Sequence, residues 1–162
     1  LPARASWPHL AAVVQRLGDA VAQGETALGE CLREVYGGVR RRGVLVVLSD
    51  FLDSSPELWK AVDLFRKSQF DVMLFHVVHP EEIELPDVPM ARFTATEGPA
   101  ARFDAEPEVL REVYRERFAR FLAEVEGAAR TRGCDWFLAR TDVDPYLFLK
   151  RCFLEREAFT ER

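Results

Sequence analysis

The feature that most constrains this chain is a run of five aliphatic residues, Val44 to Leu48, followed directly by the polar pair Ser49 and Asp50. Because the run has no polar alternation, it predicts a strand buried on both faces, as inner strands of parallel sheets are. In open α/β sheets, ligands and partners bind at the carboxyl ends of such strands. We therefore expect the functional residues of this chain near Ser49 and Asp50.

Two further strands are predicted at residues 71–78 and 134–139, and helical patterns separate the three strands. The helix expected over residues 54–68 starts with a serine cap and a proline, and a long amphipathic helix is expected over residues 107–132. Alternating strands and helices are typical of right-handed βαβ units. We expect the strands at 44–49, 71–78 and 134–139 to be parallel neighbours in that order, with helices on both faces of an α/β, Rossmann-like sheet.

Shorter elements are expected around this sheet. Apolar residues at helical spacing predict an amphipathic helix over residues 9–22. A second helix is predicted to begin at a Thr26 cap and to end in Arg40–Arg42 with Gly43 as the terminating glycine, which places the three cations where they complement the helix dipole. Residues 91–103 are predicted to form a small β-hairpin with a glycine turn at the periphery.

Composition favours one soluble domain over residues 1–162. The formal net charge of −5 argues against sequence-independent nucleic-acid binding. Cys31, Cys134 and Cys152 lack metal-ligand spacing and are interpreted as small core residues, so we expect a cytoplasmic chain. The chain begins without methionine, which predicts a longer parent protein that is free to carry a membrane anchor.

The residues around Asp50 leave two chemical interpretations open. Thr26 and Asp50 would lie above the same edge of the sheet, and oxygen ligands of this kind suit Mg²⁺ or Ca²⁺. The alternative is a haloacid-dehalogenase-like phosphotransferase with Asp50 as the nucleophile. Such enzymes place a second acid two positions later, whereas Asp53 comes three positions later and would point away. The sequence also has no Gly-rich phosphate loop, so we favour a non-catalytic role.

A histidine pair at the end of the second strand is a further candidate metal site. His76 and His79 are three positions apart, and side chains at that spacing on an extended strand face opposite ways. We therefore expect that these two residues do not share a zinc ion.

Several segments carry a resemblance that covers nearly the whole chain, and the most specific of them is Leu48 to Asp53. The others are Gly24-Glu25-Thr26, Arg41 to Val47, Phe75 to Glu82, Arg92-Phe93 and Tyr114 to Arg117. In these segments the sequence resembles the bacterial "domain of unknown function 58" proteins. That family is von Willebrand factor A-like, which implies a Rossmann-type sheet and a metal-ion-dependent adhesion site built from three loops.

The resemblance assigns roles to four residues of this chain. Thr26 lies where the second adhesion-site motif has its threonine, and Asp50 lies where the third motif has its aspartate. The first motif, Asp-x-Ser-x-Ser, is absent, so the chain resembles only the C-terminal part of such a domain. The resemblance thus implies no cofactor in this chain and Mg²⁺ in an intact parent domain. Ser49 and Asp53 are expected to belong to an interaction loop beside Asp50.

The same resemblance implies a function and partners. Members of the family are usually encoded beside MoxR-type AAA+ ATPases and are thought to act with them as assembly or chaperone-like adaptors. We therefore expect a non-catalytic protein-interaction module, with a phosphotransferase that uses Asp50 as the alternative. In the family's sheet order the missing first strand lies beside strand 44–49, so we also expect this open edge to pair with a second copy or to aggregate, or residues 1–8 to fold across it.

Overall fold

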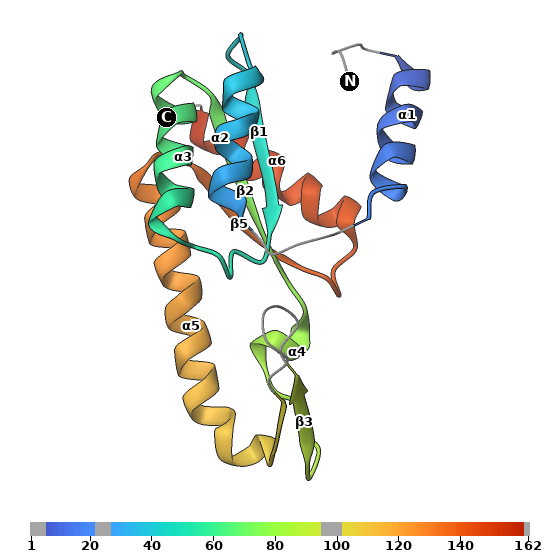
Figure 1. The fold of residues 1–162 in the computed structure, drawn as a ribbon, viewed down its shortest axis with the longest axis vertical. Coiled ribbons are helices and arrows are strands. Elements are labelled where there is room, and N and C mark those ends of the chain that lie inside the picture. The colour runs from blue at the N-terminus through green and yellow to red at the C-terminus, as the bar shows by residue number, and fades with distance from the viewer. Residues whose placement is uncertain (1–5, 22–26, 95–101, 161–162) are drawn as a thin grey trace.

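The computed structural model describes residues 6–21, 27–94 and 102–160, the last four of them as backbone only. Its centre is a three-stranded parallel sheet with the order β1-β2-β5 (Figure 1). The strands are β1 (Val44–Ser49), β2 (Asp71–Val78) and β5 (Asp135–Arg140), and a separate hairpin consists of β3 (Ala91–Thr94) and β4 (Arg102–Ala105). The helices are α1 (Trp7–Gly18), α2 (Leu28–Gly38), α3 (Pro56–Lys67), α4 (Pro80–Ile83), α5 (Pro107–Thr131) and α6 (Pro145–Thr160).

The predicted sheet is confirmed in its positions, its direction and its order. Val47 of β1 lies beside Leu74 of β2, and Leu74 lies beside Trp136 of β5. The connections between these parallel strands pass through α3 and through a long excursion that includes α5. Among the described residues, no helix is long and apolar enough to cross a membrane.

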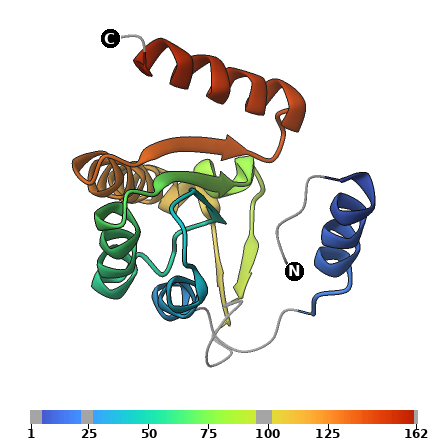
Figure 2. The ribbon, with the colours of Figure 1, turned by 90° about the horizontal axis from the view of Figure 1, so that it is seen from above.

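Helices cover the two faces of the sheet unequally (Figure 2). One face packs on α2, α3 and α5 and holds the larger core, in which Val47, Val72 and Leu74 meet the helix residues Leu58 and Phe65. Of the helices that the structure describes, only α6 packs on the other face. Its smaller core consists of Met73, Phe75 and Cys152, with Phe137, Ala139 and Phe148 packed around them.

The expectation that strand β1 is buried on both faces is wrong. Val47 is buried on the α2–α3 face, but Val44, Val46 and Leu48 on the opposite face are 55%, 46% and 70% exposed. They are exposed because α6 packs on β2 and β5, while β1 lies at the end of the described sheet. An uninterrupted apolar run shows that both faces can be buried, but burial also needs a covering element.

The helices differ from the predictions at their ends. Helix α2 ends at Gly38, where two consecutive glycines disfavour further helix, so the interpretation of Arg40–Arg42 as cations of a last helical turn is wrong. The predicted Thr26 cap lies outside the described residues. Helix α1 is amphipathic as predicted, but none of its residues is buried, and it lies apart from the sheet (Figure 2). The short helix α4 was not predicted.

The hairpin lies at the far end of the molecule from the α2–α3 pair, and α5 runs from the hairpin back to the sheet (Figure 1). Strands β3 and β4 are antiparallel as predicted, with Phe93 stacked on Phe103 at 5.1 Å between ring centroids. Arg92 and Asp104 form an ion pair across the strands at 2.8 Å. The predicted glycine turn lies outside the described residues.

Helices α2 and α3 approach each other closely at Gly29, and this contact gives the first prediction. A Cβ atom on Gly29 would lie 2.7 Å from the main-chain carbonyl carbon of Glu57 and 2.7 Å from the main-chain nitrogen of Leu58. Gly29→Ala should therefore lower the free energy of unfolding by about 1–3 kcal/mol, because backbone atoms cannot move aside as a flexible side chain can. Urea denaturation measures this change.

Gly37 on the same helix is the matched control, because a Cβ there meets no heavy atom within 4 Å. Gly37→Ala should raise the free energy of unfolding by about 0.5–1 kcal/mol through helix propensity alone. If both alanine variants changed the free energy of unfolding in the same direction, this result would contradict the described packing of α2 on α3.

Candidate functional site

The candidate site is a hollow of about 690 Å³ beyond the carboxyl ends of β1 and β2. It lies between the loop after β1, helix α4 and the first half of α5. Its lining combines charged, aromatic and aliphatic side chains: Asp50, Leu52, Glu82, Tyr114, Arg117, Phe118 and Phe121. The hollow therefore contains Asp50, the residue that the sequence singled out, and places it beside side chains of α5.

The loop after β1 is a tight turn that Ser49 and Asp50 stabilise. Phe51 has a φ of 55°, a left-handed conformation that is unfavourable for a bulky residue. The Ser49 hydroxyl oxygen accepts a hydrogen bond from the Phe51 main-chain N–H at 3.0 Å, and the Asp50 carboxylate accepts one from the Leu52 N–H at 3.2 Å. With Phe51 fully buried, the turn leaves Leu52 68% exposed on the wall of the hollow.

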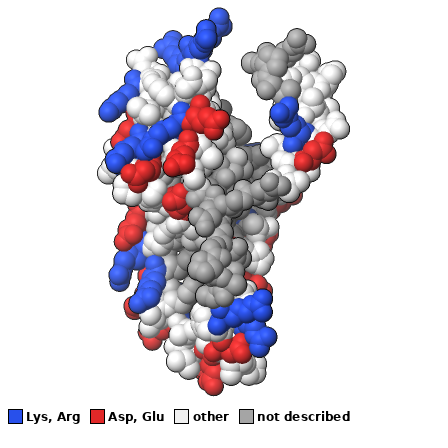
Figure 3. Space-filling view, in the orientation of Figure 1, with Lys and Arg blue, Asp and Glu red and all other residues white. Residues whose placement is uncertain are grey.

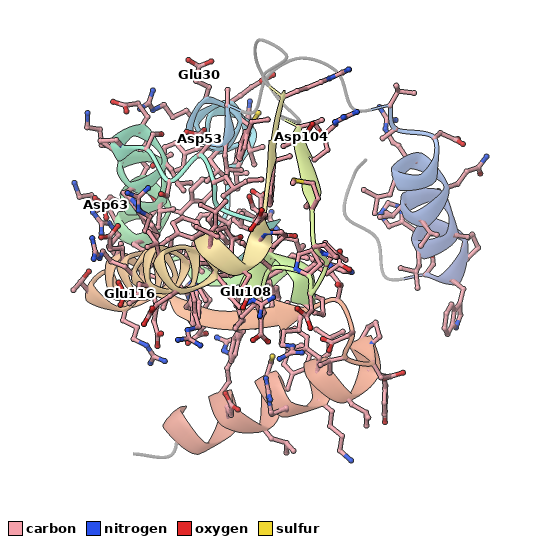
Figure 4. The ribbon with its side chains drawn as sticks, turned by 90° about the horizontal axis from the view of Figure 1, so that it is seen from below. Glu30, Asp53, Asp63, Asp104, Glu108 and Glu116 are labelled. Atoms are coloured by element: carbon pink, nitrogen blue, oxygen red, sulfur yellow. The ribbon has the colours of Figure 1, made fainter. Side chains whose placement is uncertain are left out.

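Asp53 has a partner far away in the sequence. Its carboxylate accepts a hydrogen bond from the main-chain N–H of Leu28 at 3.2 Å. Leu28 is the first residue of α2. Ala27 at the capping position has no side-chain atom that could accept a hydrogen bond from the helix N-terminus. Asp53 thus caps α2 from another loop, between that helix and the turn (Figure 4). Its carboxylate is engaged there rather than beside Asp50.

His76 in β2 and His79, directly after this strand, lie in different environments. His79 lies at the surface and caps α4, since its Nδ1 accepts a hydrogen bond from the Glu81 N–H at 3.3 Å. The carboxylate of Glu82 in turn accepts a hydrogen bond from the His79 main-chain N–H at 3.1 Å. His76 is fully buried. The two imidazoles thus lie in different places, one in the core and one at the surface.

His76 lies in an aromatic cage below the hollow. The ring centroids of Phe51, Phe121 and Trp136 lie 5.2, 5.4 and 6.0 Å from its own, all in edge-to-face arrangements. Within the part of the chain that the structure describes, no group lies in good hydrogen-bonding geometry with either ring nitrogen, and the Asp50 carbonyl acts on the ring only weakly. Burial lowers the pKa of His76 below its usual value, against a smaller opposing effect of the main-chain carbonyl and carboxylate of Asp50. The imidazole is therefore held in its neutral form.

The α5 side of the hollow contains functional candidates that the sequence did not single out. Tyr114, Phe118 and Phe121 belong to the apolar face predicted for the long helix, and Arg117 lies one turn after Tyr114 beside them. The Tyr114 hydroxyl donates a hydrogen bond of 2.6 Å to the Glu82 main-chain carbonyl, and burial, together with the Glu82 charge, raises the pKa of Tyr114. The sequence signal on this side of the hollow was the segment Tyr114 to Arg117, which carries part of the family resemblance.

The side-chain oxygen atoms described near Asp50 already have main-chain partners. Ser49, Asp50 and Asp53 each accept a hydrogen bond from a main-chain N–H. Among the residues described, no three His, Cys, Asp or Glu side chains gather as metal ligands would. Thr26 lies outside the described residues, so the structure places only the Asp50 half of the predicted Thr26–Asp50 pair.

The cysteines do not contribute to the hollow. Cys134 and Cys152 are buried, and burial raises the pKa of the Cys134 thiol to about 11. Cys31 is exposed on α2, so its interpretation as a core residue is wrong.

Acidic and basic side chains are interspersed over the face shown in Figure 3, which displays no continuous basic surface.

The capping role of Asp53 gives the second prediction. Asp53→Ala should lower the free energy of unfolding by about 1 kcal/mol, because it removes the acceptor for the first turn of α2. Asp53→Asn keeps an oxygen acceptor, so it should lower the free energy of unfolding by less than Asp53→Ala does. Asp50→Ala is the comparison at an exposed turn and should change stability by less than Asp53→Ala. Equal losses for the two alanine variants in urea denaturation would contradict the assignment.

The buried neutral His76 gives the third prediction. Its pKa is lowered in the folded chain, whereas in the unfolded chain it takes the ordinary value of about 6.5. The unfolded state therefore binds the additional proton, and this contribution to stability is complete above about pH 6.5 and is lost as the pH falls below that value.

His76→Phe should remove this part of the acid sensitivity. The measurement is the difference in unfolding free energy between the wild type and the variant from about pH 8 to about pH 5. Carboxylates titrate in both proteins, so the difference isolates His76. A difference that does not change with pH would show that folding leaves the pKa of His76 unchanged, and it would contradict the prediction.

Comparisons with known proteins extend this description. Residues 1–124 match the family described as "Protein of unknown function DUF58". Uncharacterized proteins of Mycobacterium bovis and of two strains of Mycobacterium tuberculosis are each 32% identical over 106 residues. The matched segment is 65% of this chain and 32% of each relative, so the chain spans about a third of their length. No solved structure matches it.

The family match includes the loop from Leu48 to Asp53, on which the sequence resemblance depended most. It extends over β1, β2, the hairpin and most of α5, and therefore over every element that lines the hollow. The match covers well over half of the sequence, and the chain belongs to the DUF58 family of proteins of unknown function.

Proposed function

We propose that this chain is a non-catalytic protein-interaction module with a von Willebrand factor A-like fold, and that it acts as an adaptor for a MoxR-type AAA+ ATPase. The observation that carries the proposal is the hollow beside Asp50. Exposed Leu52 lines this hollow together with the aromatic side chains of α5. Arg117 of the same helix and Asp50 line it as well. Aromatic and arginine side chains around an apolar centre are typical of protein–protein contact sites.

The side chains of the hollow also support a binding role over a catalytic one. A hydrolase or transferase needs a nucleophile within reach of a base that is itself oriented. Asp53 is the nearest acid in the sequence after Asp50, and its carboxylate binds the N-terminus of α2. The alternative is a haloacid-dehalogenase-like phosphotransferase with Asp50 as nucleophile. Phosphatase turnover that disappears in Asp50→Asn would establish this alternative.

The proposal includes a role for Mg²⁺ in a longer parent protein. We propose that Thr26 and Asp50 contribute to an adhesion-type site there, together with serines outside this chain. The relatives are about three times as long as the segment they share with this chain, which leaves room for such a motif. Calorimetric titration of Mg²⁺ into this chain and into a longer protein tests the idea. Equally tight binding by both would contradict the need for additional serines.

The fourth prediction tests the adaptor role directly. The purified chain should bind a purified MoxR-type ATPase encoded beside it, measured by calorimetry. Leu52→Asp and Arg117→Glu should each weaken that binding at least about tenfold, because they alter the centre of the hollow. Leu154→Asp on α6 is the matched control, since Leu154 is also exposed and lies on the opposite face of the sheet.

Two results would contradict the adaptor proposal. One is the absence of binding to the ATPase by a chain that is folded. The other is equal weakening by the hollow variants and by Leu154→Asp, which would locate the contact elsewhere.

A second surface for association is the outer edge of β1. Among the described residues, no strand pairs with this edge, and the side chains of one face beside it are exposed. Open edges of this kind pair readily with strands of other chains. We propose a second copy of this chain as the partner there. The alternative arrangement was that residues 1–8 fold across this edge. Residues 1–5 lie outside the description, and residues 7 and 8 belong to α1.

A further inference from the structure

The three arginines between α2 and β1 form a charged loop at the end of the sheet away from the hollow. Helix α2 ends at Gly38 and Val39 is already extended, so Arg40, Arg41 and Arg42 lie on the loop that leads into β1. All three are exposed. The loop precedes β1, whereas the hollow lies beyond the carboxyl end of that strand, so the two features lie at its opposite ends (Figure 1).

Contacts with the end of α3 hold both ends of this loop. Just before it, the hydroxyl groups of Tyr36 and Ser68 form a hydrogen bond of 2.7 Å. Just after it, the Gly43 carbonyl accepts a hydrogen bond of 3.0 Å from the Asp71 N–H. Lys67, the last residue of α3, is exposed and directly precedes Ser68. The contacts therefore place Lys67 at the same end of the molecule as the arginine loop.

Arg40–Arg42 and Lys67 together form a basic corner. Among the residues that the structure describes, none of these four side chains forms an ion pair. Glu34 lies on α2 before the loop and is likewise without an ion pair in the described part of the chain. Other acidic side chains around this end of the sheet are engaged in ion pairs: Asp63 with Arg132, Glu126 with Arg130, and Asp71 and Asp135 with Arg156.

The basic corner thus carries an excess of positive charge in a chain whose formal net charge is −5. In the space-filling view, the uppermost charged side chains are basic (Figure 3). Like charges that are held close together repel one another, and an anion that binds among them relieves this repulsion. The loop is held at both ends, so binding there requires little ordering of the main chain.

The side chains of the corner indicate the chemistry of the anion. Guanidinium groups bind carboxylates through paired hydrogen bonds, and they remain charged at every physiological pH. Val39 directly precedes Arg40, and Val35 lies one helical turn earlier. Their side chains are 40% and 50% exposed and offer apolar contacts beside the cations. This combination fits a protein segment that contains acidic and apolar residues.

Nucleic acids and anionic membranes are also polyanions, but the charge of the whole chain favours them less. Each presents phosphate groups over a wide area, and binding to them depends on a broad basic surface. Here the cations are local and the net charge is negative. We propose that the basic corner is a docking site for an acidic segment of a partner protein. This inference goes beyond the proposed function, since no residue that lines the hollow belongs to the corner.

The test is the binding of a fluorescein-labelled octaglutamate peptide to the full chain, measured by fluorescence anisotropy. The wild type should bind the peptide at about 20 mM salt, and a rise to about 200 mM salt should weaken binding at least about tenfold, because salt screens exposed charges. At low salt, combining Arg40→Gln with Arg41→Gln should weaken binding about tenfold. Lys67→Gln, on a different element, should weaken it about threefold.

Arg115→Gln combined with Arg120→Gln is the matched control. Both arginines are exposed on α5, and neither forms an ion pair within the described residues. The control therefore removes the same formal charge from another surface, and it should leave the affinity for the peptide within about twofold of the wild type.

Three results would overturn the docking site. The first is no binding of the peptide at low salt, and the second is equal weakening by the corner variants and by the α5 control. The third is tighter binding, through the same corner residues, of a single-stranded DNA oligonucleotide or of vesicles made of equal parts phosphatidylserine and phosphatidylcholine. The ATPase is absent from these experiments, and Leu52 and Arg117 are unchanged in them, so failure here differs from failure of the adaptor proposal.

Discussion

The structure depends on the pairing of β2 with a parallel strand on each of its edges. Residues 72–76 and Val78 are buried, so this strand is enclosed by neighbours in the sheet and by helices on both faces. The register set by β2 brings Val47 and Trp136 into one row with Leu74, and this row is the floor on which α2, α3 and α5 pack. A shift of one residue would turn the row to the other face, where only α6 is available.

That arrangement determines what surrounds Asp50. The turn after β1 is held by hydrogen bonds that the Ser49 and Asp50 side chains accept from main-chain N–H groups, and Phe51 anchors it in the core beside His76. Asp53 extends the same loop to the start of α2, so the loop and the helix are fixed together. The carboxylates near the strand end thus stabilise the fold, while the hollow above them presents aliphatic, aromatic and charged groups. This combination is the basis of the proposed recognition of a protein surface.

The unequal covering of the sheet has a second consequence. Because α6 packs on β2 and β5, the outer strand β1 keeps an apolar row on one face and unpaired main-chain groups along one edge. Such an edge is a liability in an isolated chain unless another strand satisfies it. The hollow and the edge lie at the end and at the side of the same strand, so both proposed associations involve the segment from Arg42 to Leu52, which lies within the family match.

The sequence by itself determined the class of fold, the three parallel strands and their order, because apolar runs and helical periods are local patterns that one segment displays completely. It also identified the loop from Ser49 to Asp53 as the place to search. It could not show that Asp53 caps a helix that begins 25 residues earlier, or that Tyr114 and Phe121 line a hollow rather than a core. Nor could it show that Val44, Val46 and Leu48 are left uncovered, since burial of a face depends on which helix packs there. Those properties were decided by the tertiary structure, because each is a relation between elements that are distant in sequence.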